Sequence, residues 1–190
     1  MSELALASLQ RRIKGMHSLW LEATATMGAE HVNHFERSGV LPAAFSLNHM
    51  TRIEDQVVHV LFGGRAPIWN EGGWLQRTRV NIDDHGKELT VAQMEQLRIG
   101  NYDSYCEYQR EVFAATEAWL DALDAERLTE VLFGGVVPPV FQKAYVARVV
   151  GEGPITMLDG IECWIFQHGI RHLGELEHAR ALVGLQGMTS

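Results

Sequence analysis

Four long segments of the chain repeat apolar residues at helical spacing, and this pattern constrains the fold more than any other feature. The first segment covers about residues 4–35, and we expect Gly15 or Gly28 to break or kink it. The second begins at Pro42, a favoured residue in the first turn of a helix. It ends at the Gly-Gly pair that starts with Gly63, because glycine adopts the left-handed conformation that ends many helices.

The other two segments begin with recognisable helix caps. The hydroxyl of Thr90 can cap a third helix while Gln93 reaches back to the cap, and one apolar face continues through the tyrosine-rich stretch that follows. The fourth helix begins near Thr156, with Asp159 in the capping-box position, and continues to about Leu185. Four long helices with one apolar face each, and no internal repeat, predict an all-α four-helix bundle.

Two connections in this bundle are unusual. Residues 65–89 are rich in glycine and polar residues and predict a long crossover loop. Within it, Trp69 and Trp74 either anchor the crossover or a dimer contact, or line the mouth of a pocket. Residues 133–153 contain two β-branched runs around Gly-Gly and Pro-Pro, and predict a short hairpin or an irregular arm before the last helix.

Length and composition exclude several classes of protein. A chain of 190 residues is near the size of one compact domain, so we expect a single domain over 1–190. The net charge of −8, without a long run of Lys or Arg, disfavours nucleic-acid binding. No apolar run is long enough to span a membrane, and the first residues do not resemble a signal peptide. Two cysteines without a CxxC motif fit a reducing compartment, so we expect a cytoplasmic protein.

Histidines lie on apolar helix faces where core residues are expected. On a helical wheel, His168, His172 and Glu175 lie on the apolar face of the last helix, and His49 lies on that of the second. A buried polar group without a partner costs about 1–3 kcal/mol, so these groups need partners. Imidazoles at i and i+4 can share one divalent cation, and a third imidazole from another helix would leave coordination positions open, as in catalytic metal sites. Alternatively, each histidine is a hydrogen-bonded core residue.

Other polar residues allow more than one interpretation. Glu175 could bind the metal, hydrogen-bond a metal-bound water as a catalytic base, orient a ligand histidine, or form a plain buried ion pair. His31 and His34 share the apolar face of the first helix, so either could be a fourth ligand, a proton shuttle or an ordinary hydrogen-bonded histidine. Cys106 and Cys163 lie off the apolar faces of their helices, which indicates inert packing rather than a nucleophile.

Three stretches resemble the DinB-like proteins, also called DinB/YfiT-like metalloenzymes. The stretch FSLNHMTRIEDQVVHVLFGG resembles the second-helix signature of that family, and HGIRHLGELEHARALVGLQG is similar to its last-helix pattern. QREVFAATEAWLDALDAERL looks like its third helix. The resemblance covers about residues 17–187 and depends most on His49, His168, His172 and Gly174, whereas Glu175 stands where the family usually has Gln.

The resemblance implies an up-up-down-down four-helix bundle in which His49, His168 and His172 bind Zn²⁺ or Ni²⁺. Members of the family include transferases and isomerases that use a low-molecular-weight thiol (mycothiol, bacillithiol or glutathione), and homodimers are common among them. It therefore implies a metal-dependent enzyme that acts on a small-molecule substrate, either by thiol-dependent S-transfer or isomerisation, or by hydrolysis. A metal-binding or sensing bundle without a substrate is the alternative.

A ferritin-like di-iron oxidase fits the sequence poorly. That class needs paired carboxylates and two ExxH motifs that face the interior of the bundle. The chain has one ExxH motif, from Glu175 to His178, and His178 lies off the apolar face. The sequence therefore argues against a di-iron site.

Overall fold

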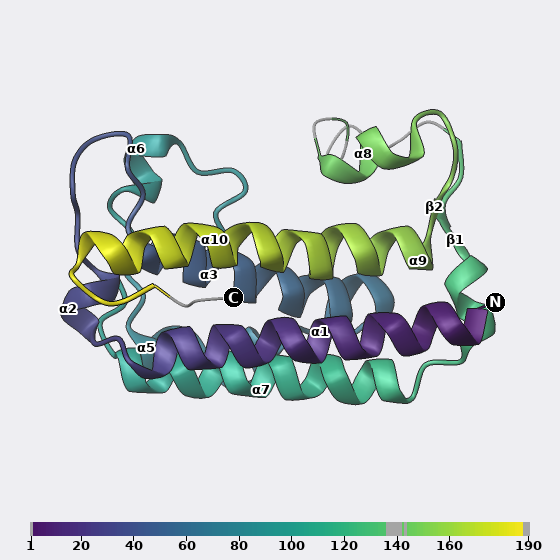
Figure 1. The fold of residues 1–190 in the computed structure, drawn as a ribbon, viewed down its shortest axis with the longest axis horizontal. Helices are drawn as coiled ribbons and strands as arrows, with labels where there is room; N and C mark the ends of the chain where they lie inside the picture. Colours follow the sequence, from purple (N-terminus) through teal and green to yellow (C-terminus); the bar gives the residue numbers. More distant parts are fainter. Residues whose placement is uncertain (1, 136–141, 143, 188–190) are drawn as a thin grey trace.

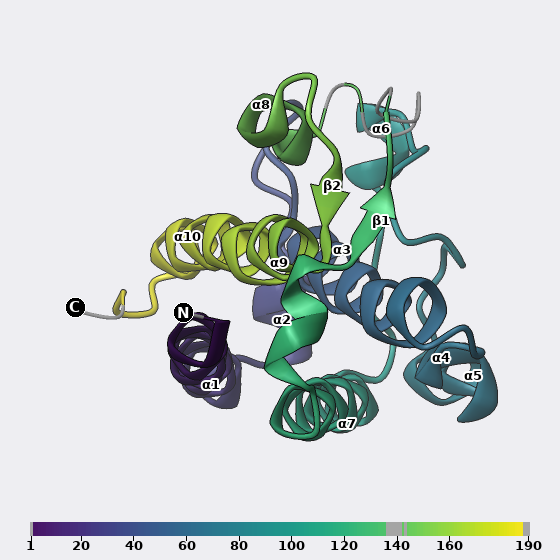
Figure 2. The same ribbon diagram turned by 90° about the vertical axis from the view of Figure 1, so that its right-hand side faces the viewer.

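The computed structural model describes residues 2–135, 142 and 144–187, and it confirms an all-α bundle (Figure 1). Four helical columns pack side by side around one core, which Figure 2 shows end-on. They are α1 (Ser2–Ala25), α3 (Ala43–Asp55) with its extension η1 (Gln56–Phe62), α7 (Tyr102–Asp121), and α9 (Met157–Gly160), η4 (Ile161–Phe166) and α10 (Gln167–Leu182) in series. Among the described residues, no helix is long and apolar enough to cross a membrane.

The core is formed by the inward faces of all four columns. Its largest fully buried side chains are aromatic and aliphatic: Trp20, Leu9, Ile13 and Met16 of α1, Leu47 and Met50 of α3, Tyr105, Tyr108 and Phe113 of α7, and Trp74, Leu97 and Ile99 of the crossover. Burying such side chains stabilises the fold by about 1.5–3 kcal/mol each before the cost in chain entropy. The inward faces are those that the apolar spacing predicts.

The predicted ends of the second and fourth columns are confirmed. Pro42 precedes the first turn of α3, and the column ends at Gly63 after η1. The Thr156 hydroxyl accepts a hydrogen bond from the Asp159 backbone N–H, while the Asp159 carboxylate accepts from the Thr156 backbone N–H at 2.9 Å. This capping box fixes the start of α9.

The first and third segments are each interrupted. Gly28 separates α1 from the short helix α2 (Ala29–Val32), whereas Gly15 lies inside α1 without breaking it. The capping box at Thr90 forms as expected, but the helix it starts, α6 (Val91–Met94), is a single turn. The predicted continuous third helix is therefore wrong, because Asn101 provides a second cap by accepting from the Ser104 N–H and starts α7 independently.

The directions of the columns also differ from the expected order. Arg12 pairs with Glu162, and Arg180 donates to the Ala23 carbonyl, so α1 and α10 run parallel. In contrast, α3 and α7 both run opposite to α1 (Figure 1). The bundle is therefore up-down-down-up and the expected up-up-down-down order is wrong. The reason is that residues 63–101 return the chain along the bundle between α3 and α7, which keeps these two helices parallel.

The crossover is ordered rather than a plain loop. It contains α4 (Ile68–Glu71) and α5 (Trp74–Thr78). Trp69 and Trp74 are 2% and 1% exposed, and their rings lie 5.0 and 5.6 Å from the ring of Tyr108 on α7. These contacts bury both tryptophans and confirm the prediction that they anchor the crossover.

A small β-structure joins α7 to the last column. After the 3-10 helix η2 (Ala125–Thr129), strand β1 (Val131–Phe133) pairs antiparallel with β2 (Ile155–Thr156), as Figure 2 shows. The strands flank the predicted hairpin region instead of lying within it. The second β-branched run forms the helix α8 (Tyr145–Val150), which packs outside the bundle against α9 and η4. Residues 136–141, with the Pro-Pro pair, lie outside the described residues.

Candidate metal centre

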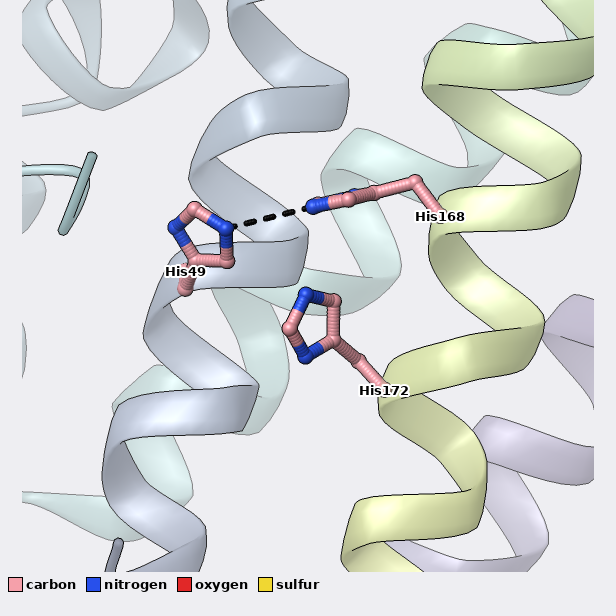
Figure 3. A group of neighbouring side chains, drawn as sticks. All are labelled: His49, His168 and His172. Carbon is pink, nitrogen blue, oxygen red and sulfur yellow. Dashed lines mark hydrogen bonds between the residues drawn. The ribbon is translucent and has the colours of Figure 1, made fainter. Parts of the chain in front are cut away.

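The three histidines singled out by the sequence lie together where α3 and α10 pack antiparallel (Figure 3). His49 comes from α3, and His168 and His172 come from successive turns of α10. The Nε2 atoms of His49 and His168 are 3.2 Å apart, and the ring centroids are separated by 4.5–5.0 Å. One nitrogen from each ring lies within 4.8 Å of the other two, so the group could hold a metal ion.

Hydrogen bonds on the far side of two rings orient the group. His49 Nδ1 contacts the backbone carbonyl of His85, and His172 Nδ1 lies 2.7 Å from a carboxylate oxygen of Glu175. Because neither acceptor can donate, each Nδ1 carries the proton and the Nε2 lone pair is left for the centre of the group. Metal-binding histidines are typically held in this way by a carbonyl or carboxylate.

Glu175 lies behind His172. Its carboxylate also accepts a hydrogen bond of 2.8 Å from the hydroxyl of Ser46 on α3, so it links the two helices. Burial raises the pKa of this carboxyl, but the hydrogen bonds from His172 and Ser46 outweigh burial, and the net pKa is lower than usual. Glu175 is therefore a carboxylate at neutral pH.

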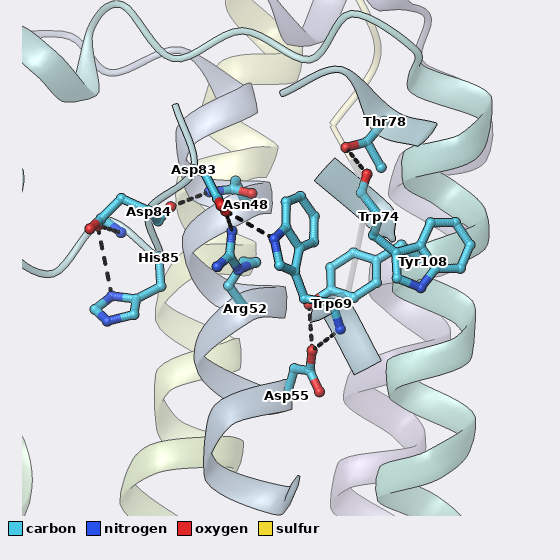
Figure 4. A network of polar contacts seen from close by, with 11 residues as sticks. Asn48, Arg52, Asp55, Trp69, Trp74, Thr78, Asp83, Asp84, His85 and Tyr108 are labelled. Carbon is cyan, nitrogen blue, oxygen red and sulfur yellow. Dashed lines mark hydrogen bonds and ion pairs between the residues drawn. The ribbon is translucent and has the colours of Figure 1, made fainter. Parts of the chain in front are cut away.

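An ionic network holds the crossover segment that carries the His85 carbonyl (Figure 4). Asp83 accepts hydrogen bonds of 3.0 Å from both the Arg52 guanidinium and the Trp69 indole N–H. The Arg52 guanidinium also stacks on the Trp69 ring, 4.0 Å from its centroid. The buried tryptophan thus connects the packing of the crossover to the position of His85.

The turn at Gly86 places the backbone directly against the site. Asn48 donates to the Asp84 carbonyl at 3.0 Å, and the Asp84 carboxylate accepts from the Gly86 N–H at 2.6 Å. Gly86 has a φ of +94°, and a Cβ atom there would lie 2.8 Å from the Phe45 ring and 3.1 Å from His49 Nδ1. Only glycine fits both the conformation and the space.

The chemistry of the donor set suits a borderline divalent metal. Two nitrogens bound at about 2.0–2.1 Å to one tetrahedral Zn²⁺ are about 3.3 Å apart, close to the 3.2 Å between His49 and His168. Burial lowers the pKa of His49 to about 4, and burial together with the neighbouring His172 and His49 rings lowers the pKa of His168 well below its usual value. Both rings are therefore neutral at physiological pH, the form that binds metal.

A mostly apolar cavity of about 520 Å³ opens beside the histidines. His49 and His168 form part of its wall, and the rest comes from α3–η1, η4–α10, the start of α8 with Ala144 before it, and His85 and Lys87 of the crossover. It reaches the surface at exposed side chains, among them Val60 and Tyr145. Ligand sites typically have this volume and this mixture of apolar walls with a few polar groups.

Cys163 corrects one sequence-based expectation. It lies on the cavity wall and is 5% exposed, although the helical wheel placed it off the apolar face. The reason is that η4 is a π-helix, whose wider turns change the direction of each side chain relative to an α-helix. Burial raises the pKa of the Cys163 thiol to about 11, and it also raises the pKa of Cys106, which agrees with inert cysteines.

The other candidate residues lie outside the group. Among the described residues, the potential metal group includes neither His31 nor His34. His31 Nδ1 accepts the Gly28 backbone N–H, and His34 pairs with Glu36 at 2.9 Å, so both have local partners. The role of the His85 carbonyl could not be predicted from the sequence, because any residue type can supply a backbone oxygen.

Comparison with known proteins supports the fold alone. No protein-family model matches the chain, and no curated protein matches it. A crystal structure described as the conserved protein of locus from Enterococcus faecalis superposes with a TM-score of 0.73. The match covers 94% of this chain and 96% of that chain at 16% sequence identity. This likeness shows a shared helical fold.

The lowered pKa of His49 predicts acid sensitivity in the metal-free protein. Below about pH 6.5 the unfolded chain protonates His49 while the folded chain does not, so stability falls from pH 6.5 to about 4. The loss from this residue should be roughly 2 kcal/mol by pH 4.5. Urea unfolding of the wild type and His49→Gln at pH 7 and 4.5 measures it. An equal loss of stability between pH 7 and 4.5 in the wild type and in His49→Gln would contradict the prediction.

Proposed function

We propose that this chain binds one divalent metal ion, Zn²⁺ or Ni²⁺, through the Nε2 atoms of His49, His168 and His172. The observation that carries the proposal is the convergence of these nitrogens, with Nδ1 of two of the rings held by acceptors behind them. Simple core histidines would not need to bring three ring nitrogens within 4.8 Å of one another. We also propose membership of the DinB-like proteins, which the positions of the three histidines on the second and last helical columns support.

We further propose that the site is catalytic. When bound, such an ion can act as a Lewis acid or lower the pKa of a coordinated thiol or water. The cavity beside His49 and His168 gives a small molecule access to the group, whereas a sensing or structural site would be enclosed by protein ligands. Thiol-dependent S-transfer or isomerisation is our preferred reaction class, by analogy with the DinB-like proteins, and hydrolysis is the second.

Of the roles open to Glu175, its geometry supports orientation of a ligand. The carboxylate contacts His172 Nδ1 and the Ser46 hydroxyl. Its oxygens are not part of the group of three histidines that could hold the metal. A carboxylate there fixes the direction of the ring and increases its basicity. We therefore propose Glu175 as a positioning residue for His172 rather than as a base.

Metal analysis of the purified protein tests the proposal. We expect about one metal ion per chain in the wild type and loss of that ion in His49→Ala and in His172→Ala. The matched control is His178→Ala, which removes an exposed histidine from the same helix and should leave the metal content unchanged. A folded wild type that holds no ion after incubation with Zn²⁺ or Ni²⁺ would refute the proposal.

Removal of the Glu175 carboxylate should weaken the metal without abolishing it. We expect Glu175→Ala to lower zinc affinity by about 10- to 100-fold, because the partner behind His172 is lost. Competition with a chelating dye measures the affinity, and Glu177→Ala on the same helix is the control. An affinity that is equal in the wild type and Glu175→Ala would exclude the positioning role.

A further inference from the structure

Three polar side chains on the cavity wall have unused hydrogen-bonding groups. Within the described part of the chain, the side chains of Gln56, Gln167 and Arg171 make no hydrogen bond or ion pair. Glu175, one turn beyond Arg171, is already bonded to His172 and Ser46. Arg171 is thus a cavity-lining residue whose guanidinium donors are available to a ligand.

The position of Arg171 links it to the metal group. It follows His168 by three residues, which places the two side chains on adjacent turns of the same helix. The positive charge of Arg171 contributes to the lowered pKa of His168, so the two groups are close enough to interact electrostatically. An anion held by Arg171 would therefore lie beside the metal group.

The rest of the wall is apolar and extends away from this polar corner. Ile53, Val57, Val60 and Leu61 follow each other along one face of α3 and η1, and Trp164 lies opposite on η4. Because the two columns are antiparallel, His49 and His168 lie toward one end of this wall and Leu61 toward the other. The cavity thus has a cationic corner, formed by Arg171 and Gln167, and an apolar groove, formed by Ile53, Val57, Val60 and Leu61.

The net negative charge of the chain makes a local cationic group necessary for anion binding. With a net charge of −8, the chain as a whole repels anions, so favourable anion binding depends on local groups. A guanidinium binds a carboxylate through two parallel N–H donors, and primary amides can add further donors. The apolar side chains of the groove that the structure describes would not compensate a charge on the body of the ligand, which favours a charge at one end of the molecule.

We propose that the cavity binds an organic anion with an apolar body, and that Arg171 holds its carboxylate beside the metal group. Gln167 donates to the polar end, and the apolar body lies along Val57 and Val60. This inference names the substrate class of the proposed metal enzyme and therefore depends on that function for its catalytic meaning. The binding of the anion itself depends only on the cavity, because Arg171 is not one of the proposed metal ligands.

Calorimetric titration with octanoate, and with octan-1-ol as the neutral analogue, tests the proposal. Wild type, Arg171→Gln, Arg171→Lys and Val60→Asp are compared, each after treatment with EDTA and again with Zn²⁺. The control is Arg110→Gln, which removes an exposed arginine of α7 that does not line the cavity. Arg171 and Val60 are both exposed, so these variants should fold normally.

We expect saturable binding of octanoate to the wild type and about tenfold weaker binding to Arg171→Gln, the loss of one charge-assisted hydrogen-bonding partner. Arg171→Lys should recover part of the affinity, and octan-1-ol should not distinguish the arginine variants. Val60→Asp should weaken both ligands. Arg110→Gln should bind like the wild type.

Two results would overturn the inference: no octanoate binding by the wild type, or equal binding by Arg171→Gln and the wild type. The two metal conditions separate this failure from failure of the metal proposal. Octanoate binding that requires zinc and ignores Arg171 supports the metal and refutes the anion site. A tenfold effect of Arg171→Gln in a protein that never retains metal supports the anion site and refutes the metal.

Discussion

Addition of Zn²⁺ to the metal-free protein is expected to raise its melting temperature by about 5–10 °C. An ion that binds only the folded state at 100 times its Kd stabilises that state by about 2.7 kcal/mol. For a chain of 190 residues, each kcal/mol corresponds to a shift of about 2–4 °C. Thermal unfolding followed by circular dichroism, with and without zinc, measures the shift.

The histidine variants show whether that shift arises at the proposed site. His168→Ala should abolish the shift, because only the imidazoles of His49 and His172 remain. His49 also loses its close neighbour, whose Nε2 lies 3.2 Å from its own. His178→Ala should keep the full shift. An equal shift in the wild type and His168→Ala would mean that zinc binds elsewhere on the chain.

The largest loss of stability is expected from Asp55→Ala, at about 3–5 kcal/mol. The Asp55 side chain is 1% exposed and accepts hydrogen bonds from the backbone N–H groups of Ile68 and Trp69, both at 2.9 Å. It also accepts from the Tyr108 hydroxyl at 2.8 Å and pairs with His59 at 2.9 Å. Alanine would leave these buried donors without a partner, which costs more than the loss of the bonds alone.

Urea unfolding of metal-free protein measures this effect without interference from the ion. Asp83→Ala is the matched control, since the Asp83 side chain is 50% exposed and water can replace it. We expect a loss of about 1 kcal/mol for Asp83→Ala. Similar losses of stability for the two variants would show that the buried contacts of Asp55 stabilise the protein no more than the exposed contacts of Asp83.

Much of the fold and of the histidine group was predictable from the sequence because both depend on local helical geometry. The spacing of His168 and His172 fixes their common face in any α-helix, and His49 lies on the apolar face of its own helix. The caps at Pro42 and Thr156 are likewise determined by residues within one turn. Such signals do not require knowledge of the tertiary structure.

The errors arose where the backbone departs from an α-helix or where distant segments meet. The wheel assumed α-helical turns through Cys163, which lies in the π-helix η4. Apolar spacing has no direction along the bundle axis, so it could not show that α3 and α7 run parallel. Contacts such as Ser46 with Glu175 depend on that tertiary arrangement, and the two residues are 129 positions apart.

The tight turn at Gly86 means that the three histidines alone do not define a working site. A related chain with all three, but with a side chain in place of this glycine, would have to displace the Phe45 ring or the His49 ring by several tenths of an ångström. That displacement would disrupt the hydrogen bond between His49 Nδ1 and the His85 carbonyl, which orients the His49 ring. A search for proteins that share this centre should therefore require the glycine of the crossover together with the histidines.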